Sequence, residues 1–184
     1  MRSVALAQND CMLTLTSAKL TKPDRVVIMG ARGFVGRAST DKLKVEGVTV
    51  VALSRKEVNL LTANGATELA GHLTPSTTLI VTSARAPVKN TPMLLDNLRM
   101  MQAVIEAVKT RPVAHLVYIS SDAVYADSDD PMTEVSPVAP SSLHGMMHLT
   151  REMMLSNELA DIPKVFVRPT VIFGPADPHN GYGP

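Results

Sequence analysis

The sequence predicts an α/β protein built on a doubly wound parallel sheet with helices on both faces, in three α/β/α layers. Short β-branched runs alternate with helical patterns between residues 25 and 167, and the connections between them are short. Alternation of this kind favours parallel strands joined by right-handed crossovers. The 184 residues are enough for one well-cored domain. We therefore predict an N-terminal extension at 1–24 and a single domain at 25–184.

The first half of the domain alternates strand and helix. Residues 25–29 read Arg-Val-Val-Ile-Met, a run typical of a strand buried on both faces. Gly30 ends this strand, and a helical pattern over 34–46 stops at Gly47, a favoured C-terminal cap. A buried strand at 48–53, a short helix at 63–72 and a strand at 78–82 are predicted to follow.

The second half continues the alternation. Pro87 and Pro92 bound a predicted loop, and apolar residues at three- and four-residue spacing predict an amphipathic helix over 94–108. A strand is predicted at 113–120, after Pro112, and an irregular loop at 127–141, where proline and acidic residues gather. Ser141 or Ser142 can cap a helix that runs to about residue 157, before a last strand at 164–167.

Composition argues against several classes of partner. The net charge is +1 and no basic block occurs, so a nucleic-acid partner is not predicted. The one cysteine, Cys11, cannot form a disulfide within the chain, which suits a reducing compartment. No apolar run approaches membrane-spanning length, and residues 1–22 lack the pattern of a signal peptide. We expect a cytoplasmic protein with no membrane partner.

A glycine motif carries the strongest functional signal. Gly30, Gly33 and Gly36 form a GxxGxxG sequence between the first strand and its helix, with Arg32, Phe34 and Val35 in the same turn. Such glycines allow a tight turn, a close approach to a pyrophosphate, and close packing of helix on strand. The helix N-terminus adds free N–H groups. An ordinary glycine-rich turn is the alternative, but the flanking strands and helix favour a Rossmann-type site for NAD or NADP.

The end of the second strand bears on the choice of cofactor. An NAD site usually has an acidic residue there to bind the ribose hydroxyls. Ser54 and Arg55 instead offer a hydroxyl and a guanidinium, which suit the 2′-phosphate of NADP. The alternative is that Arg55 is a solvated loop charge. NADP is therefore the predicted cofactor, with NAD as the alternative.

Further motifs recur after residue 25. Asn97 begins an Asn-Leu-Arg-Met-Met run, residues 120–125 read Ser-Ser-Asp-Ala-Val-Tyr, Arg168-Pro169 precedes Gly174-Pro175, and prolines surround Thr133-Glu134. With the glycine motif, these resemble the extended short-chain dehydrogenase/reductases, the NAD-dependent epimerase/dehydratase family, whose members often act on nucleotide sugars. Ala126 replaces a glycine of the family pattern. The resemblance implies cofactor contacts at Asn59, Leu60, Ser83, Ala84, Arg85, Asn97, His148 and Pro169.

At the catalytic residues, this sequence differs from the family that it resembles. The family pairs a Ser or Thr with a Tyr and a Lys four residues apart on a helix. Here Ser121 matches the serine, while His144 and His148 stand at the Tyr and Lys positions. Asp122 stands where some dehydratases have an acid, although a turn-forming role is the more usual one for such a residue.

Three interpretations of the histidine pair remain open. His144 can act as acid/base while neutral His148 binds the ribose, or the site can bind nucleotide without turnover. A metal site is the least favoured, and no metal is predicted. The resemblance thus implies hydride transfer on a nucleotide sugar or similar carbonyl compound; the alternative is a noncatalytic NAD(P)-binding or redox-sensing protein.

The resemblance carries two more expectations. Family members continue into a substrate-binding region, so we expect this chain to lack most of that C-terminal part. Members often pair through two helices, which correspond here to 94–108 and 143–157. A homodimer is therefore expected, although methionine- and leucine-rich stripes of this kind are as often plain core.

Overall fold

The computed structural model describes residues 21–175 and 177 and contains a five-stranded, entirely parallel sheet. Its strand order is β2-β1-β3-β4-β5. The elements in chain order are β1 (Arg25–Met29), α1 (Phe34–Val45), β2 (Thr49–Leu53), α2 (Gly65–Gly71), β3 (Thr77–Val81), α3 (Thr91–Thr110), β4 (His115–Ile119), the 3-10 turn η1 (Asp122–Val124), α4 (Leu143–Glu158) and β5 (Lys164–Val167). The predicted fold class is confirmed.

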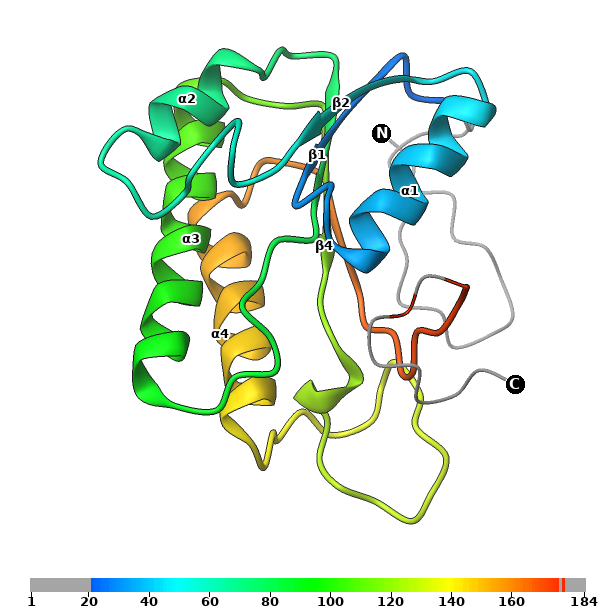
Figure 1. Cartoon of the computed structure of the whole chain (residues 1–184). Coiled ribbons are helices and arrows are strands. Elements are labelled where there is room, and N and C mark those ends of the chain that lie inside the picture. The colour runs from blue at the N-terminus through cyan, green and yellow to red at the C-terminus, as the bar shows by residue number, and fades with distance from the viewer. Residues whose placement is uncertain (1–20, 176, 178–184) are drawn as a thin grey trace.

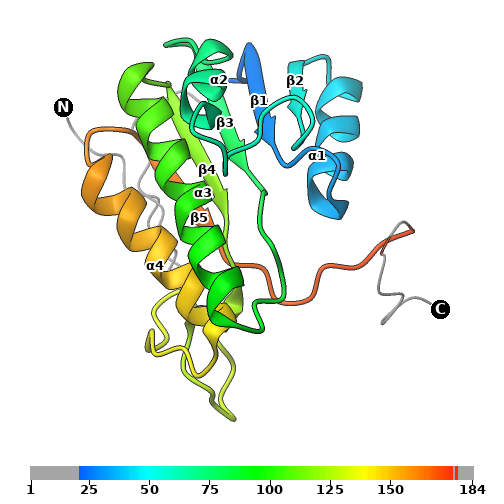
Figure 2. The same ribbon diagram turned by 60° about the vertical axis from the view of Figure 1, so that its left-hand side comes forward.

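Helices cover both faces of the sheet, as predicted. Figure 1 shows α2, α3 and α4 on one face and α1 on the other, and in Figure 2 α3 and α4 run side by side. The larger core lies under α2–α4, where Leu79 and Leu116 of the sheet meet Met101 and Ile105 of α3. A smaller cluster around Val26 and Ile28 lies under α1. None of the described helices is both long and apolar enough to cross a membrane.

Caps explain where the helices begin and end. Gly47 follows α1 with a φ of +72°, as its predicted capping role requires. Ser142 caps α4 by accepting the N–H of Gly145 at 3.1 Å. The start of α3 was predicted three residues too late. Asn90 accepts the N–H of Met93 at 3.0 Å, and Pro92 stands in the first turn, where a missing N–H costs nothing.

The strand register brings the predicted site to one edge of the sheet. Met29 pairs with both Leu53 and Val81, and Val81 pairs with Tyr118, so the carboxyl ends of these strands lie level. The segments that follow them, which begin near Gly30, Ser54, Thr82 and Ser120, therefore emerge together. This edge is where open parallel sheets bind ligands.

The two methionine-rich helices contribute to both core and surface. Met101 and Met147 are fully buried, so the core interpretation holds for them. Met146 and Met153, by contrast, are about half exposed on α4. A homodimer through α3 and α4 stays a prediction.

The glycine turn yields a prediction about stability. A Cβ at Gly36 would lie 2.3 Å from the carbonyl oxygen of Gly30, whereas a Cβ at Gly71 would meet nothing within 4 Å. We expect Gly36→Ala to lower the free energy of unfolding by about 2 kcal/mol or more, measured by urea denaturation. The control Gly71→Ala should leave it within about 0.5 kcal/mol or raise it slightly. Equal stability of the two variants would contradict the close packing of α1 on this turn.

Candidate active site

A pocket of about 280 Å³ lies at the carboxyl edge of β1, β2 and β3. It brings together most of the predicted cofactor residues: Gly30, Arg32, Gly33, Ser54, Arg55, Asn59, Leu60, Ser83, Ala84 and Arg85. Met29, Val58 and Met100 form apolar parts of its lining that the sequence analysis did not single out. Their apolar character gave no signal, because buried strand and helix residues look alike whether or not they face a pocket.

The glycine turn has the geometry that a dinucleotide needs. Gly30 has a φ of +99°, and a Cβ there would lie 2.5 Å from Thr82 Oγ1 and 2.7 Å from the nitrogen of Ser83. A Cβ at Gly33 would approach only the Gly30 oxygen, at 3.3 Å, so the rest of that face of Gly33 is open. Only glycine fits at Gly30, and the backbone at Gly33 can be approached closely by a ligand.

The first turn of α1 can bind an anion. The helix begins with Phe34, Val35 and Gly36, and no side chain caps its first turn. In α3 and α4, by contrast, Asn90 and Ser142 provide caps. The uncapped N–H groups and the helix dipole therefore remain available to phosphate oxygens. The residues present fit a bound dinucleotide.

A carboxylate that was not predicted from the sequence, that of Glu57, is bound to two residues that line this pocket, Ser54 and Arg32. The Oε2 atom of Glu57 accepts hydrogen bonds from the backbone N–H of Ser54 at 2.8 Å and from its hydroxyl at 2.5 Å. Arg32 Nη2 lies 3.9 Å from Glu57 Oε1, while Arg55 is exposed. Hydrogen bonding from Ser54 holds the pKa of Glu57 below its usual value. The Ser-x-x-Glu spacing of a capping box, from Ser54 to Glu57, is the sequence signal that could have identified it.

Asn97 does not line the pocket and acts through the loop after β3. Its fully buried amide accepts the N–H of Arg85 at 3.0 Å and donates to the carbonyl oxygens of Arg85, at 3.0 Å, and Met93, at 2.8 Å. The Arg85 guanidinium forms an ion pair with Asp96. Asn97 therefore holds Arg85 in place at the pocket wall.

His144 and His148 share one face of α4, as their spacing predicts. Their ring centroids lie 4.8 Å apart and the rings are nearly perpendicular. His144 is half-buried, and its Nδ1 atom is buried with no hydrogen-bond partner among the described residues. Burial lowers its pKa below 6.5, against the opposing charge of Asp122. His144 is thus a neutral imidazole near pH 7.

His148 is held by a tyrosine from β4. Its Nδ1 atom lies 2.6 Å from the hydroxyl of Tyr118, and both side chains are buried. Burial lowers the pKa of His148 to about 3 and raises that of Tyr118 to about 12, so both groups are uncharged near pH 7. A phenol is the stronger proton donor of the two, so we assign its O–H as donor to Nδ1. The remaining imidazole proton then resides on Nε2.

Arg151 brings a positive charge beside His148. It is fully buried, its Nη2 donates to the carbonyl oxygen of Ser83 at 3.0 Å, and its guanidinium lies 5.0 Å from the centre of the Tyr118 ring. The hydroxyl of Ser83 is buried and has no hydrogen-bond partner among the described residues. Arg151 is not among the residues predicted from the sequence, although it stands three residues after His148 and therefore near the same helix face.

Ser121 caps the turn that follows β4. Its hydroxyl accepts the N–H of Ala123 at 3.1 Å and donates to Asp122 Oδ1 at 3.0 Å. The turn packs against α4 where a Cβ at Gly145 would lie only 1.9 Å from the Ala123 oxygen. Ser121 is thereby held next to the first turn of α4, with its hydroxyl engaged in the turn.

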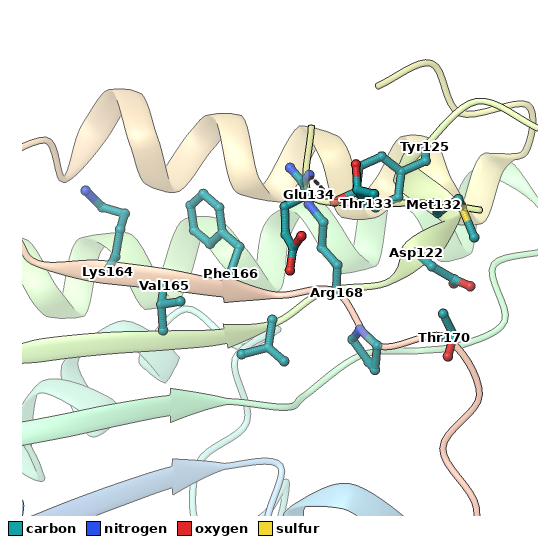
Figure 3. A pocket seen from close by; sticks show the side chains of 12 residues that line it. Asp122, Tyr125, Met132, Thr133, Glu134, Lys164, Val165, Phe166, Arg168 and Thr170 are labelled. Atoms are coloured by element: carbon teal, nitrogen blue, oxygen red, sulfur yellow. Dashed lines mark hydrogen bonds between the residues drawn. The ribbon is translucent and has the colours of Figure 1, made fainter. Parts of the chain in front are cut away.

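A larger hollow of about 570 Å³ runs along β5, the edge strand of the sheet. Figure 3 shows Lys164, Phe166 and Arg168 on one side of this strand and its continuation. Pro169 lines this hollow and not the glycine pocket, and its carbonyl oxygen accepts the N–H of Asp122 at 3.1 Å. Pro169, like Asn97 and His148, is therefore not among the residues that line the glycine pocket.

Comparisons with known proteins agree with this geometry. Residues 26–183 match the model of the NAD dependent epimerase/dehydratase family. The 2-alkyl-3-oxoalkanoate reductase of Shewanella oneidensis is 26% identical over 190 residues, covering 90% of this chain and 49% of the reductase. A UDP-galactose 4-epimerase structure superposes with a TM-score of 0.68 at 24% identity, over 78% of this chain and 55% of that one.

A third similar structure contains bound ligands. MoeE5 in complex with UDP-glucose and NAD is 25% identical, with a TM-score of 0.61, and the match covers 77% of this chain and 52% of MoeE5. The chain thus spans about half the length of these relatives. Since the family match extends over most of the chain, the protein belongs to the NAD-dependent epimerase/dehydratase family of extended short-chain dehydrogenases.

Proposed function

We propose that this chain binds a nicotinamide dinucleotide in the pocket at the glycine turn and takes part in hydride transfer on a carbonyl substrate. The observation that supports this most directly is the position of that pocket, which adjoins the uncapped N-terminus of α1. The turn around Gly30 and Gly33 and the first N–H groups of α1 would hold the pyrophosphate. The bound cofactor supplies the hydride acceptor or donor that the protein lacks.

The histidine pair supplies the proton chemistry in this proposal. Tyr118 fixes the proton of His148 on Nε2, which leaves that atom as a hydrogen-bond donor suited to a ribose hydroxyl. His144 exchanges a proton at Nε2, because its Nδ1 atom is the buried one. A neutral His148 lacks the positive charge of the family's lysine, and buried Arg151 places one next to it instead.

A noncatalytic dinucleotide-binding protein is the second candidate. It is favoured by Ser121, whose hydroxyl is engaged within its own turn and so has to reorient before it can orient a substrate oxygen. Turnover separates the two candidates. If nucleotide binds but no substrate of a broad panel is converted, the noncatalytic function is correct.

The names of the relatives define that panel. One similar structure is a UDP-galactose 4-epimerase and another contains UDP-glucose, whereas the curated relative is a 2-alkyl-3-oxoalkanoate reductase. We therefore propose a nucleotide sugar as the substrate class. The substrate panel should contain 3-oxo acids as well as nucleotide sugars.

His144→Gln tests the acid/base assignment. We expect kcat to fall about 100-fold or more, because the group that moves the proton is lost, while the Kd for nucleotide changes little. The matched control is Met146→Gln on the exposed side of the same helix, which should leave both constants unchanged. Undiminished kcat in His144→Gln would exclude His144 as the acid/base.

Tyr118→Phe tests the hydrogen bond to His148. Without the phenol hydroxyl, nothing holds the His148 proton on Nε2. A buried nitrogen is also left unpaired, at a cost of about 1–3 kcal/mol in stability. We expect nucleotide binding to weaken several-fold and the 15N shifts of the His148 ring to change. Tyr125→Phe is the control, because the Tyr125 hydroxyl bonds to Arg168 and not to a histidine; it should leave those shifts unaltered.

The neutral state of His148 predicts how stability depends on pH. The unfolded chain takes up a proton at this residue near pH 6.5, but the folded chain does not until about pH 3. The free energy of unfolding should therefore fall as the pH drops through this interval, by up to about 1.4 kcal/mol per pH unit from His148. Denaturation of His148→Gln at several pH values should show a smaller slope, and an identical slope would disprove the assignment.

A further inference from the structure

We propose that Glu57 selects the cofactor: its carboxylate occupies the anion site formed by Ser54 and Arg32, so that NAD(H) binds in preference to NADP(H). This inference rests on the proposed nucleotide-binding function and deepens it. It reverses the preference for NADP that Ser54 and Arg55 suggest in the sequence.

Donors suited to a phosphate converge on Glu57. The backbone N–H and the hydroxyl of Ser54 both donate to Oε2, and the Arg32 guanidinium lies 3.9 Å from Oε1. A main-chain amide, a hydroxyl and a guanidinium are the groups that bind phosphate oxygens in proteins. In this protein the carboxylate already accepts from the amide and the hydroxyl of Ser54 and forms an ion pair with Arg32, and both of these partners line the pocket.

The two cofactors respond to such a carboxylate in opposite ways. The adenosine ribose of NAD carries a 2′-hydroxyl, which can donate a hydrogen bond to Glu57. In NADP the same position is a phosphate, which has no proton to donate at neutral pH and would lie beside a second negative charge. To admit it, Glu57 has to leave both hydrogen bonds from Ser54, and like charges placed together cost binding energy.

Glu57 keeps its charge under ordinary conditions. The hydrogen bonds from Ser54 lower the pKa of this carboxyl, with a smaller contribution from the charge of Arg32. The barrier to the 2′-phosphate is therefore present at neutral pH. Arg55, exposed on the same loop, adds positive charge that becomes useful to a phosphate only when Glu57 is neutralised.

The turn that carries Glu57 does not depend on the carboxylate alone. The N–H groups of Glu57 and Val58 both donate to the carbonyl oxygen of Ser54, at 3.1 and 3.0 Å. The N–H of Lys56 donates to the Ser54 hydroxyl at 3.2 Å. A glutamine at position 57 retains an acceptor for Ser54 and removes only the charge, so Glu57→Gln is expected to fold.

The test is calorimetric titration of the 184-residue chain and of Glu57→Gln with NADH and with NADPH. We expect wild type to bind NADH more tightly, and Glu57→Gln to shift the ratio of the two Kd values toward NADPH by about tenfold or more. Glu106→Gln is the charge-matched control, because Glu106 is exposed on α3 and bonds to Gln102; its ratio should equal that of wild type. Thermal melting verifies that each variant is folded.

A second variant shows whether the freed donors bind the phosphate. Adding Arg32→Met to Glu57→Gln should reduce NADPH affinity more than NADH affinity. Tighter binding of NADPH than NADH by wild type, or an unchanged ratio in Glu57→Gln, would overturn the inference while leaving the nucleotide-binding function intact. Failure of both nucleotides to bind folded wild type would overturn the proposed function, and the inference with it.

Discussion

Two buried charges on α4 determine how this helix lies against the sheet. Arg151 donates to the carbonyl oxygen after β3 and covers the ring of Tyr118, while Glu152 accepts from Ser120 and pairs with Arg168 at 2.6 Å. Buried charges are tolerated only where such partners are in place. Because these partners come from the ends of β3, β4 and β5, a shift of α4 would break contacts to several strands at once. The helix therefore has one favourable position.

That position of α4 determines the surroundings of His144 and His148. It places His148 against Tyr118 and His144 beside it, at the same edge of the sheet as the glycine turn. Burial makes both imidazoles neutral, so neither reproduces the charge of the lysine that the family has on this helix. The positive charge resides one turn further on, at Arg151, where it is fixed in the core and cannot reach a ligand as freely as a flexible lysine. In the proposed function, proton transfer and positive charge are thus divided among three side chains.

The segment after β2 shows a similar exchange of positions. Ser54 and Arg55 lack the acidic group that follows the second strand in NAD-binding relatives of this fold. Glu57 restores a carboxylate from a turn further along the chain and uses Ser54 as its donor. After β2 and on α4 alike, a group expected at one position is supplied from a nearby one. Comparison of single aligned positions therefore underestimates what the site contains.

The sequence by itself determined the sheet, the glycine turn and the common helix face of His144 and His148, because strand alternation, turn chemistry and helical spacing are local properties. Tertiary structure decided the rest. Asn97 holds a loop and Pro169 lines a different hollow, and no local pattern indicates such partners. The contacts of His148 with Tyr118 and of Arg151 with Ser83 join residues 30 and 68 positions apart. Side chains so distant along the chain meet only when the strands align at one edge and α4 packs across them, and that packing sets their charge and their availability to a ligand.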